Sequence, residues 1–68
     1  MSGTPLLYAA EKGHLLMVKL LIRSGANVNS ASISLLPSTP LDHARSNGHT
    51  EVMQLLKSYG AIQYGFLD

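Results

Sequence analysis

The chain contains no cysteine and no tryptophan, and its only aromatic residues are three tyrosines and one phenylalanine. Without cysteine, neither a disulfide nor a cysteine-based zinc site can stabilise it. Charged residues make up only 13% of the chain and are interspersed, with a net charge of +1, so we expect no phosphate-tracking surface and no nucleic-acid partner. The most apolar stretch, residues 15–22, is far shorter than the roughly 20 residues that span a bilayer.

The first three residues carry no positive side chain, which argues against a secretory signal peptide. These absences together lead us to expect a soluble, cytoplasmic or nuclear protein with no membrane partner. A chain of 68 residues is one small domain, which buries only about 60% of the surface that its unfolded form exposes. Apolar burial must therefore offset nearly all of the conformational entropy that is lost on folding.

The chain does contain an internal repeat with an offset of 35 residues. Thr-Pro-Leu at residues 4–6 recurs at 39–41, and Gly-His at 13–14 recurs at 48–49. A Leu-Leu pair and a Gly-Ala pair recur at the same offset. A period between about 20 and 50 residues indicates a stacked-repeat protein. Such stacks usually build a binding surface and not a catalytic pocket.

Each copy of the repeat predicts a pair of short helices. Threonine is a good N-cap and proline fits the first helical position, so helices should begin at Pro5 and Pro40. Second helices are predicted over about 15–23 and 50–59. Glycine ends each of the four helices, in the left-handed conformation. The expected core residues of the second helices are Met17, Val18, Leu20, Leu21, Ile22, Val52, Met53, Leu55 and Leu56.

The order and spacing of these motifs resemble the ankyrin repeat over residues 3–61. The resemblance implies an all-α, ankyrin-type helical solenoid of two helix-turn-helix repeats, with a β-hairpin-like finger between them. We therefore expect one domain over residues 1–68. Its expected parts are repeat 1 at about 3–29, the finger at 30–38, repeat 2 at about 39–61 and a C-terminal tail at 62–68.

The sequence departs from the family pattern at two places. The family usually carries a histidine directly after Thr-Pro-Leu, which helps to tie neighbouring repeats together, but this chain has Leu7 and Asp42 there. The usual period is 33 residues, and the two extra residues fall most easily in the finger. The resulting finger is long and apolar.

The resemblance implies a non-enzymatic protein–protein interaction module that needs no cofactor. The fingers and the first helices of such repeats form a concave face that usually binds a partner protein. The apolar finger is the sharper candidate, because clustered exposed apolar area usually marks an interaction site. The predicted partner-binding residues are Ile33, Leu35, Leu36 and Ser38 in the finger, and Glu11, Lys12, Ser46 and Asn47 at the ends of the first helices.

The two copies differ in polarity in one direction. Leu15 is replaced by Thr50 in the second copy, and Ile22 is replaced by Lys57. Terminal repeats need a polar outer face, so the second copy should be a C-terminal cap. We expect preceding repeats, or a homo-oligomer, to cover the N-terminal face. The alternative function is therefore structural: a capping or self-associating unit of a larger protein with no partner site of its own.

Three histidines and one Asp-His pair are the residue types in this chain that could form a metal or catalytic site. No two histidines have the i, i+4 spacing of a common zinc motif, so we expect no metal. Instead, His14 and His49 should bond the backbone at a helix start. Asp42 and His43 are neighbours on one helix and point about 100° apart, and no nucleophile-elbow pattern surrounds the nearby serines. We therefore expect no catalytic residues.

Overall fold

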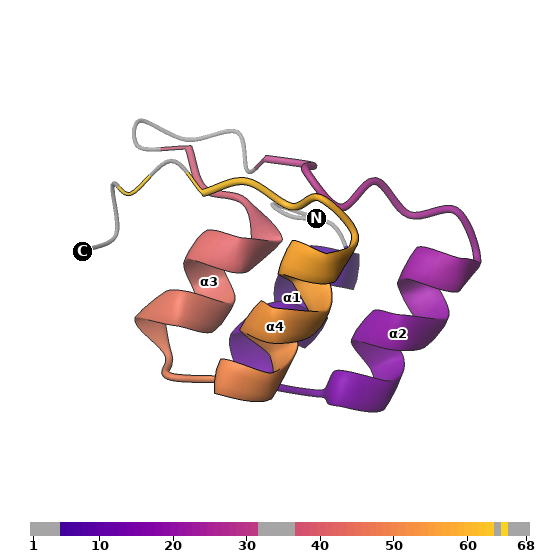
Figure 1. Cartoon of the computed structure of the whole chain (residues 1–68), viewed down its shortest axis with the longest axis horizontal. Coiled ribbons are helices and arrows are strands. Elements are labelled where there is room, and N and C mark those ends of the chain that lie inside the picture. The colour runs from indigo at the N-terminus through magenta and orange to yellow at the C-terminus, as the bar shows by residue number, and fades with distance from the viewer. Residues whose placement is uncertain (1–4, 32–36, 64, 66–68) are drawn as a thin grey trace.

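The computed structural model describes residues 5–31, 37–63 and 65. Within this part of the chain lie four helices, which pack in two pairs and confirm the all-α prediction (Figure 1). The inner helices of the two repeats pack side by side, and an outer helix covers each of them. The helices are α1 (Pro5–Lys12), α2 (Leu15–Arg23), α3 (Pro40–Ser46) and α4 (Thr50–Ser58).

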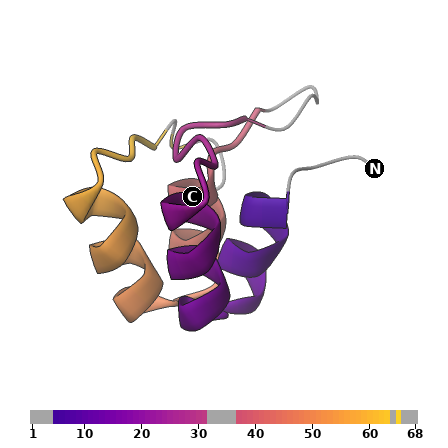
Figure 2. The same cartoon turned by 90° about the vertical axis from the view of Figure 1, so that its right-hand side faces the viewer.

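The two Gly-His turns lie at one edge of the molecule, whereas the segments that leave α2 and α4 run along the opposite edge (Figures 1 and 2). None of the described helices has the length and apolar character needed to cross a membrane. The predicted finger falls largely on residues 32–36, so its predicted hairpin conformation lies outside the described residues.

Helix α3 begins as the sequence predicts, with Thr39 as its N-cap and Pro40 in the first turn. The Asp42 amide donates to Thr39 Oγ1 at 3.3 Å, and the Thr39 amide donates to Asp42 Oδ2 at 2.9 Å. These two bonds form a capping box, which satisfies two donors at the helix start. Asp42, at the position where the family usually has histidine, is therefore part of the helix cap.

Helices α1 and α3 end at glycines with a positive φ, as predicted. The φ of Gly13 is 74° and that of Gly48 is 73°. At the first turn, the His14 amide donates to the Ala9 carbonyl and the Gly13 amide donates to the Ala10 carbonyl. This pair of bonds is a Schellman motif, which uses the carbonyl oxygens left open at the end of a helix.

The buried core is shared by the two repeats. Alanines on the inner helices α1 and α3 allow these two helices to pack closely against each other. Larger aliphatic side chains from both repeats fill the rest of the core. Because each repeat supplies half of this core, the helices are stable only when they are stacked. The core cluster consists of Leu6, Ala9, Ala10, Val18, Leu41, Ala44, Val52 and Leu56.

The predicted core of α2 differs from the observed one. Val18 is fully buried and lies in the shared core, whereas Met17 and Leu20 are 49% and 51% exposed. Successive residues of a helix point about 100° apart. Val18 faces repeat 2, so Met17 and Leu20 lie on a side of the helix that repeat 2 does not cover.

The chain that follows α4 is tied back onto both repeats. The Ile62 amide donates to Asn29 Oδ1 at 2.8 Å, and Thr39 Oγ1 lies 2.6 Å from the Ile62 carbonyl oxygen. The Gly65 amide donates to Asp42 Oδ1 at 2.9 Å. Asp42 thus accepts bonds from two segments through its two carboxylate oxygens, and this use of the carboxylate explains why a charged side chain can be buried there.

Candidate functional site

The exposed surface of the inner helices contains four of the predicted partner-binding residues. Glu11 and Lys12 lie at the end of α1, and Ser46 and Asn47 lie at the end of α3. All four are exposed. Because α1 and α3 pack against each other, these side chains line the same end of two neighbouring helices.

An aromatic side chain that the sequence prediction left out lies one turn before these residues on α1. Tyr8 is 59% exposed, and the Lys12 ammonium lies 5.8 Å from the centre of its ring. This is within range of a cation–π interaction, which orients both side chains. The i, i+4 spacing of Tyr8 and Lys12 was the available sequence signal, because it puts the two residues on one side of the helix.

His43 occupies on α3 the repeat position that Tyr8 occupies on α1. Its ring is half-buried, and its Nε2 lies 2.8 Å from Ser38 Oγ. Ser38 itself is only 3% exposed. The hydroxyl of Ser38 is therefore turned toward His43 and holds the imidazole in place. The other predicted finger residues, Ile33, Leu35 and Leu36, lie outside the described residues.

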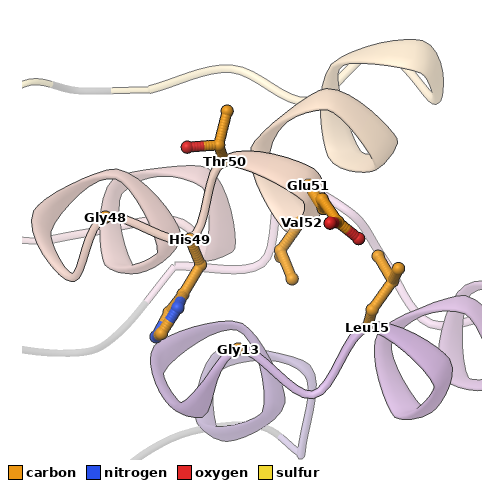
Figure 3. Close-up of a pocket in the computed structure, with 7 residues that line it drawn as sticks. All are labelled: Gly13, Leu15, Gly48, His49, Thr50, Glu51 and Val52. Carbon is orange, nitrogen blue, oxygen red and sulfur yellow. The ribbon is translucent and has the colours of Figure 1, made fainter.

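His49 joins the two repeats at their shared boundary, which we call the seam. Its Nε2 lies 2.9 Å from the main-chain oxygen of Glu11, and since a carbonyl only accepts, Nε2 must carry the proton. The His49 ring also lies directly over Gly13, where an added Cβ would come within 2.5 Å of Nδ1 (Figure 3). The glycine in the Gly-His turn of repeat 1 thus makes room for the histidine of repeat 2.

This geometry corrects the prediction for the histidine of the Gly-His turn. His49 does bond to the backbone, but at the end of α1 in the preceding repeat and not at the start of its own helix. The bond supplies a tie between repeats that the missing histidine after Thr-Pro-Leu would otherwise provide. The corresponding ring of His14 makes no cap bond at the start of α2 and is exposed.

A hollow of about 410 Å³ opens beside this seam, at the Gly-His turns of both repeats. The His49 ring points to one side of it, toward Gly13, while the Glu51 carboxylate extends toward Leu15 (Figure 3). Among the described residues, no group of three histidine, aspartate or glutamate side chains is close enough to hold a metal ion. The hollow is lined by Gly13, Leu15, Gly48, His49, Thr50, Glu51 and Val52.

Stacked helix pairs with exposed polar and aromatic side chains on the inner helices define a helical repeat protein of the binding type. A family model described as "Ankyrin repeats (3 copies)" matches residues 1–65 of the chain. The chain belongs to the ankyrin repeat family. Ankyrin repeats are in general protein-interaction modules.

One similar protein is from Oryza sativa subsp. japonica and is named "Probable E3 ubiquitin-protein ligase XBOS33". The two sequences are 47% identical over 54 residues, which is 79% of this chain. The matched region is only 10% of the rice protein. The chain therefore corresponds to a small, ankyrin-repeat part of this relative.

Proposed function

We propose that this chain binds a partner protein through the surface formed by Tyr8 and Lys12 on α1, His43 on α3 and Asn47 at the C-cap of α3. The observation that carries the proposal is the exposed Tyr8 ring under the Lys12 ammonium. Tyrosine is enriched at the residues that dominate binding energy, because it offers a large contact area with few rotatable bonds. The cation–π contact reduces the entropy that Tyr8 loses on binding.

The polar residues around this ring serve as the specificity contacts of the same surface. Glu11 and Ser46 are exposed beside Lys12 and Asn47, so they can form hydrogen bonds or ion pairs at the rim of an interface. Ser38 is buried and would not contact the partner directly; its hydroxyl holds the His43 ring in position for binding. Ile33, Leu35 and Leu36 add apolar anchors in this proposal, on the strength of their sequence pattern alone.

The structural alternative, in which the second repeat is a cap, is favoured by a separate observation. Thr50 and Lys57 are exposed on α4, at the positions where repeat 1 has the less polar Leu15 and Ile22. A polar outer face closes a stack against further repeats. Capping and partner binding use different surfaces, so one chain can perform both.

The name of the rice relative adds a candidate activity for the whole protein, namely ubiquitin transfer. In that case the ankyrin repeats would supply the binding of a substrate or regulator, because ankyrin repeats are in general protein-interaction modules. An in vitro ubiquitination assay with the full-length protein tests this activity. Repeating the assay without residues 4–61 should abolish modification of the bound protein but leave self-modification intact.

The binding proposal is tested by isolating a partner on the immobilised chain and titrating the purified partner against variants. Tyr8→Ala should weaken binding about tenfold or more, the effect typical of a dominant contact residue. It should leave thermal unfolding nearly unchanged, because the side chain is mostly exposed. Gln54→Ala, at an exposed position on the outer helix α4, is the matched control and should leave affinity unchanged.

Two outcomes would contradict this function. If the Tyr8→Ala and Gln54→Ala variants bound the partner with equal affinity, the inner helices would not be part of the binding surface. The triple replacement of Ile33, Leu35 and Leu36 by serine separates the roles of the finger. If that variant lowers the melting temperature and does not change affinity, the finger is structural and the capping role gains support.

A further inference from the structure

The turn between α3 and α4 contains the one Asn-Gly pair of the sequence, Asn47 followed by Gly48. In such a pair the main-chain nitrogen of the glycine can attack the side-chain amide of the asparagine, because glycine has no Cβ to hinder the approach. Both residues are exposed, and Gly48 lines the hollow beside the seam (Figure 3). A Cβ placed on Gly48 would meet no atom of the described residues within 4 Å, so solvent reaches this side of the turn.

The other two asparagines of the chain are less favourably placed for this attack. Asn27 precedes Val28, whose branched side chain crowds the neighbouring main chain. Asn29 precedes Ser30, and its Oδ1 accepts from the Ile62 amide at 2.8 Å, which fixes the orientation of the side-chain amide. The asparagine of the Gly-His turn is therefore the most reactive of the three.

We propose that Asn47 is a site of spontaneous deamidation, whose products loosen the seam between the repeats. In the first step the Gly48 nitrogen forms a bond to Asn47 Cγ. Its proton passes through the solvent to the side-chain NH2 group, which leaves as ammonia, and a five-membered succinimide ring remains. One water molecule then opens the ring at either carbonyl carbon. The products are aspartate and isoaspartate, and in isoaspartate the main chain is longer by one CH2 group.

The folded turn slows this reaction, because both reacting groups are held in hydrogen bonds. The Gly48 amide donates to the Arg45 carbonyl at 3.1 Å, and Asn47 Nδ2 donates to the His43 carbonyl at 2.8 Å. A nitrogen held in this way must be released before it attacks. Exposed helix ends open locally at a small cost in free energy. The reaction therefore proceeds in the folded chain, at the rate that opening of the end of α3 allows.

Deamidation would change the turn in two ways. An aspartate at this position cannot donate to the His43 carbonyl, and it places a negative charge at the C-terminal end of α3, where the helix dipole disfavours it. Isoaspartate lengthens the main chain shortly before His49. The His49 amide donates to the Ala44 carbonyl, and its ring donates to the Glu11 oxygen. The isoaspartate form therefore displaces the histidine that joins the two repeats.

The test is incubation of the purified 68-residue chain at neutral pH, folded and in denaturant, followed by peptide mapping. Mass spectrometry measures conversion at each asparagine, and an isoaspartate-specific methyltransferase labels that product. We expect Asn47 to convert first in the folded chain. Its rate should be about five- to 150-fold lower than in denaturant, the factor that corresponds to opening two hydrogen bonds. The measurement needs no partner protein, so it is independent of the proposed binding surface.

Three results would overturn the proposal. The first is the absence of conversion at Asn47 in the folded chain during a period in which the denatured chain converts completely. The second is conversion of Asn27 or Asn29 that equals or exceeds that of Asn47 in the folded chain. The third is an equal rate at Asn47 in the folded and denatured chains, which would exclude protection by the turn. Asn47→Gln is the blocked control, because its attack would require a six-membered ring.

Substitution also separates the lost hydrogen bond from the added charge. Asn47→Asp reproduces one product and should lower the melting temperature by about 4–8 °C. Ser46→Asp is the matched control, since it adds the same charge at an exposed neighbouring position and leaves the bond from Asn47 to the His43 carbonyl in place. It should lower the melting temperature less. Equal decreases would overturn the role of the bond.

The effect on the seam is tested with the isoaspartate form, separated by chromatography from incubated protein. It should melt at a lower temperature than the Asn47→Asp variant, because only isoaspartate displaces His49. In a His49→Ala background this difference should shrink, which shows the coupling between the two sites. Equal melting temperatures of the isoaspartate form and the Asn47→Asp variant would overturn the loosening of the seam.

Discussion

The fit of His49 over Gly13 can be tested with two glycine substitutions that differ in one respect. Gly13 and Gly48 have nearly the same φ, 74° and 73°. An added Cβ at Gly13 would lie 2.5 Å from His49 Nδ1, whereas an added Cβ at Gly48 would meet no atom within 4 Å. Gly48→Ala therefore measures the cost of the backbone conformation alone, and Gly13→Ala adds the collision with the ring.

The expected magnitudes follow from these contacts. A left-handed conformation costs a non-glycine residue about 1–2 kcal/mol. The reduced entropy of the unfolded chain offsets about 0.4–1 kcal/mol of this cost. Gly48→Ala should thus destabilise the fold by about 1 kcal/mol. Gly13→Ala also displaces the His49 ring and breaks its bond to the Glu11 oxygen, worth about 0.5–1.5 kcal/mol before any packing is lost.

Thermal and denaturant unfolding of both variants provide the measurement. The melting temperature of Gly13→Ala should lie about 4–8 °C below that of Gly48→Ala, since about 1 kcal/mol shifts a domain of this size by that amount. In a His49→Ala background, the cost of Gly13→Ala should fall to the cost of Gly48→Ala, which shows the coupling directly. Equal melting temperatures of the two glycine variants in the wild-type background would refute the reasoning.

Three further substitutions test the core, the helix cap and the tail. Leu56→Ala should lower the free energy of unfolding by about 2–5 kcal/mol in denaturant titrations, and a loss under about 1 kcal/mol would contradict a shared core. Thr39→Ala should cost about 1–2 kcal/mol in thermal unfolding, whereas the exposed Ser58→Ala control should stay within about 0.5 kcal/mol. Asn29→Ala should speed hydrogen exchange of the Ile62 amide about three- to tenfold, and an unchanged rate would exclude the tie to the tail.

Much of the local structure could be predicted from the sequence because local contacts determine it. Thr39 and Pro40 start a helix wherever they precede an apolar stripe, since the cap and the fixed φ act within one turn. Gly13 and Gly48 end helices because glycine reaches a positive φ without steric cost. Repetition of these signals then gave the number and order of the described helices.

The sides of the outer helices could not be assigned as reliably. Met17 and Val18 are both apolar and adjacent, and the sequence favoured both as core residues. Their exposed fractions, 49% and 0%, depend on which side of α2 the next repeat covers. Hydrophobicity alone carries no information about that choice, because both residues would be favourable to bury.

In the candidate site, too, the sequence predicts the environment of some residues and not of others. The exposure of Glu11, Lys12, Ser46 and Asn47 agrees with their positions in the repeat. Ser38, in contrast, is predicted from the sequence as a partner-binding residue of the finger, and only the folded chain shows that it is buried beside His43. A polar residue next to a helix cap can face the solvent or a neighbouring side chain, and packing at long range decides between the two.

The 35-residue repeat by itself determined the architecture of this protein: paired short helices, glycine stops and membership of a stacked-repeat class, because each is encoded by contacts within a few residues. Only the tertiary structure decided how the repeats are joined. The bond from His49 to the Glu11 oxygen spans 38 residues, and Asp42 joins a helix cap to the tail. Such ties depend on which groups meet after the helices pack, and no local pattern specifies that meeting.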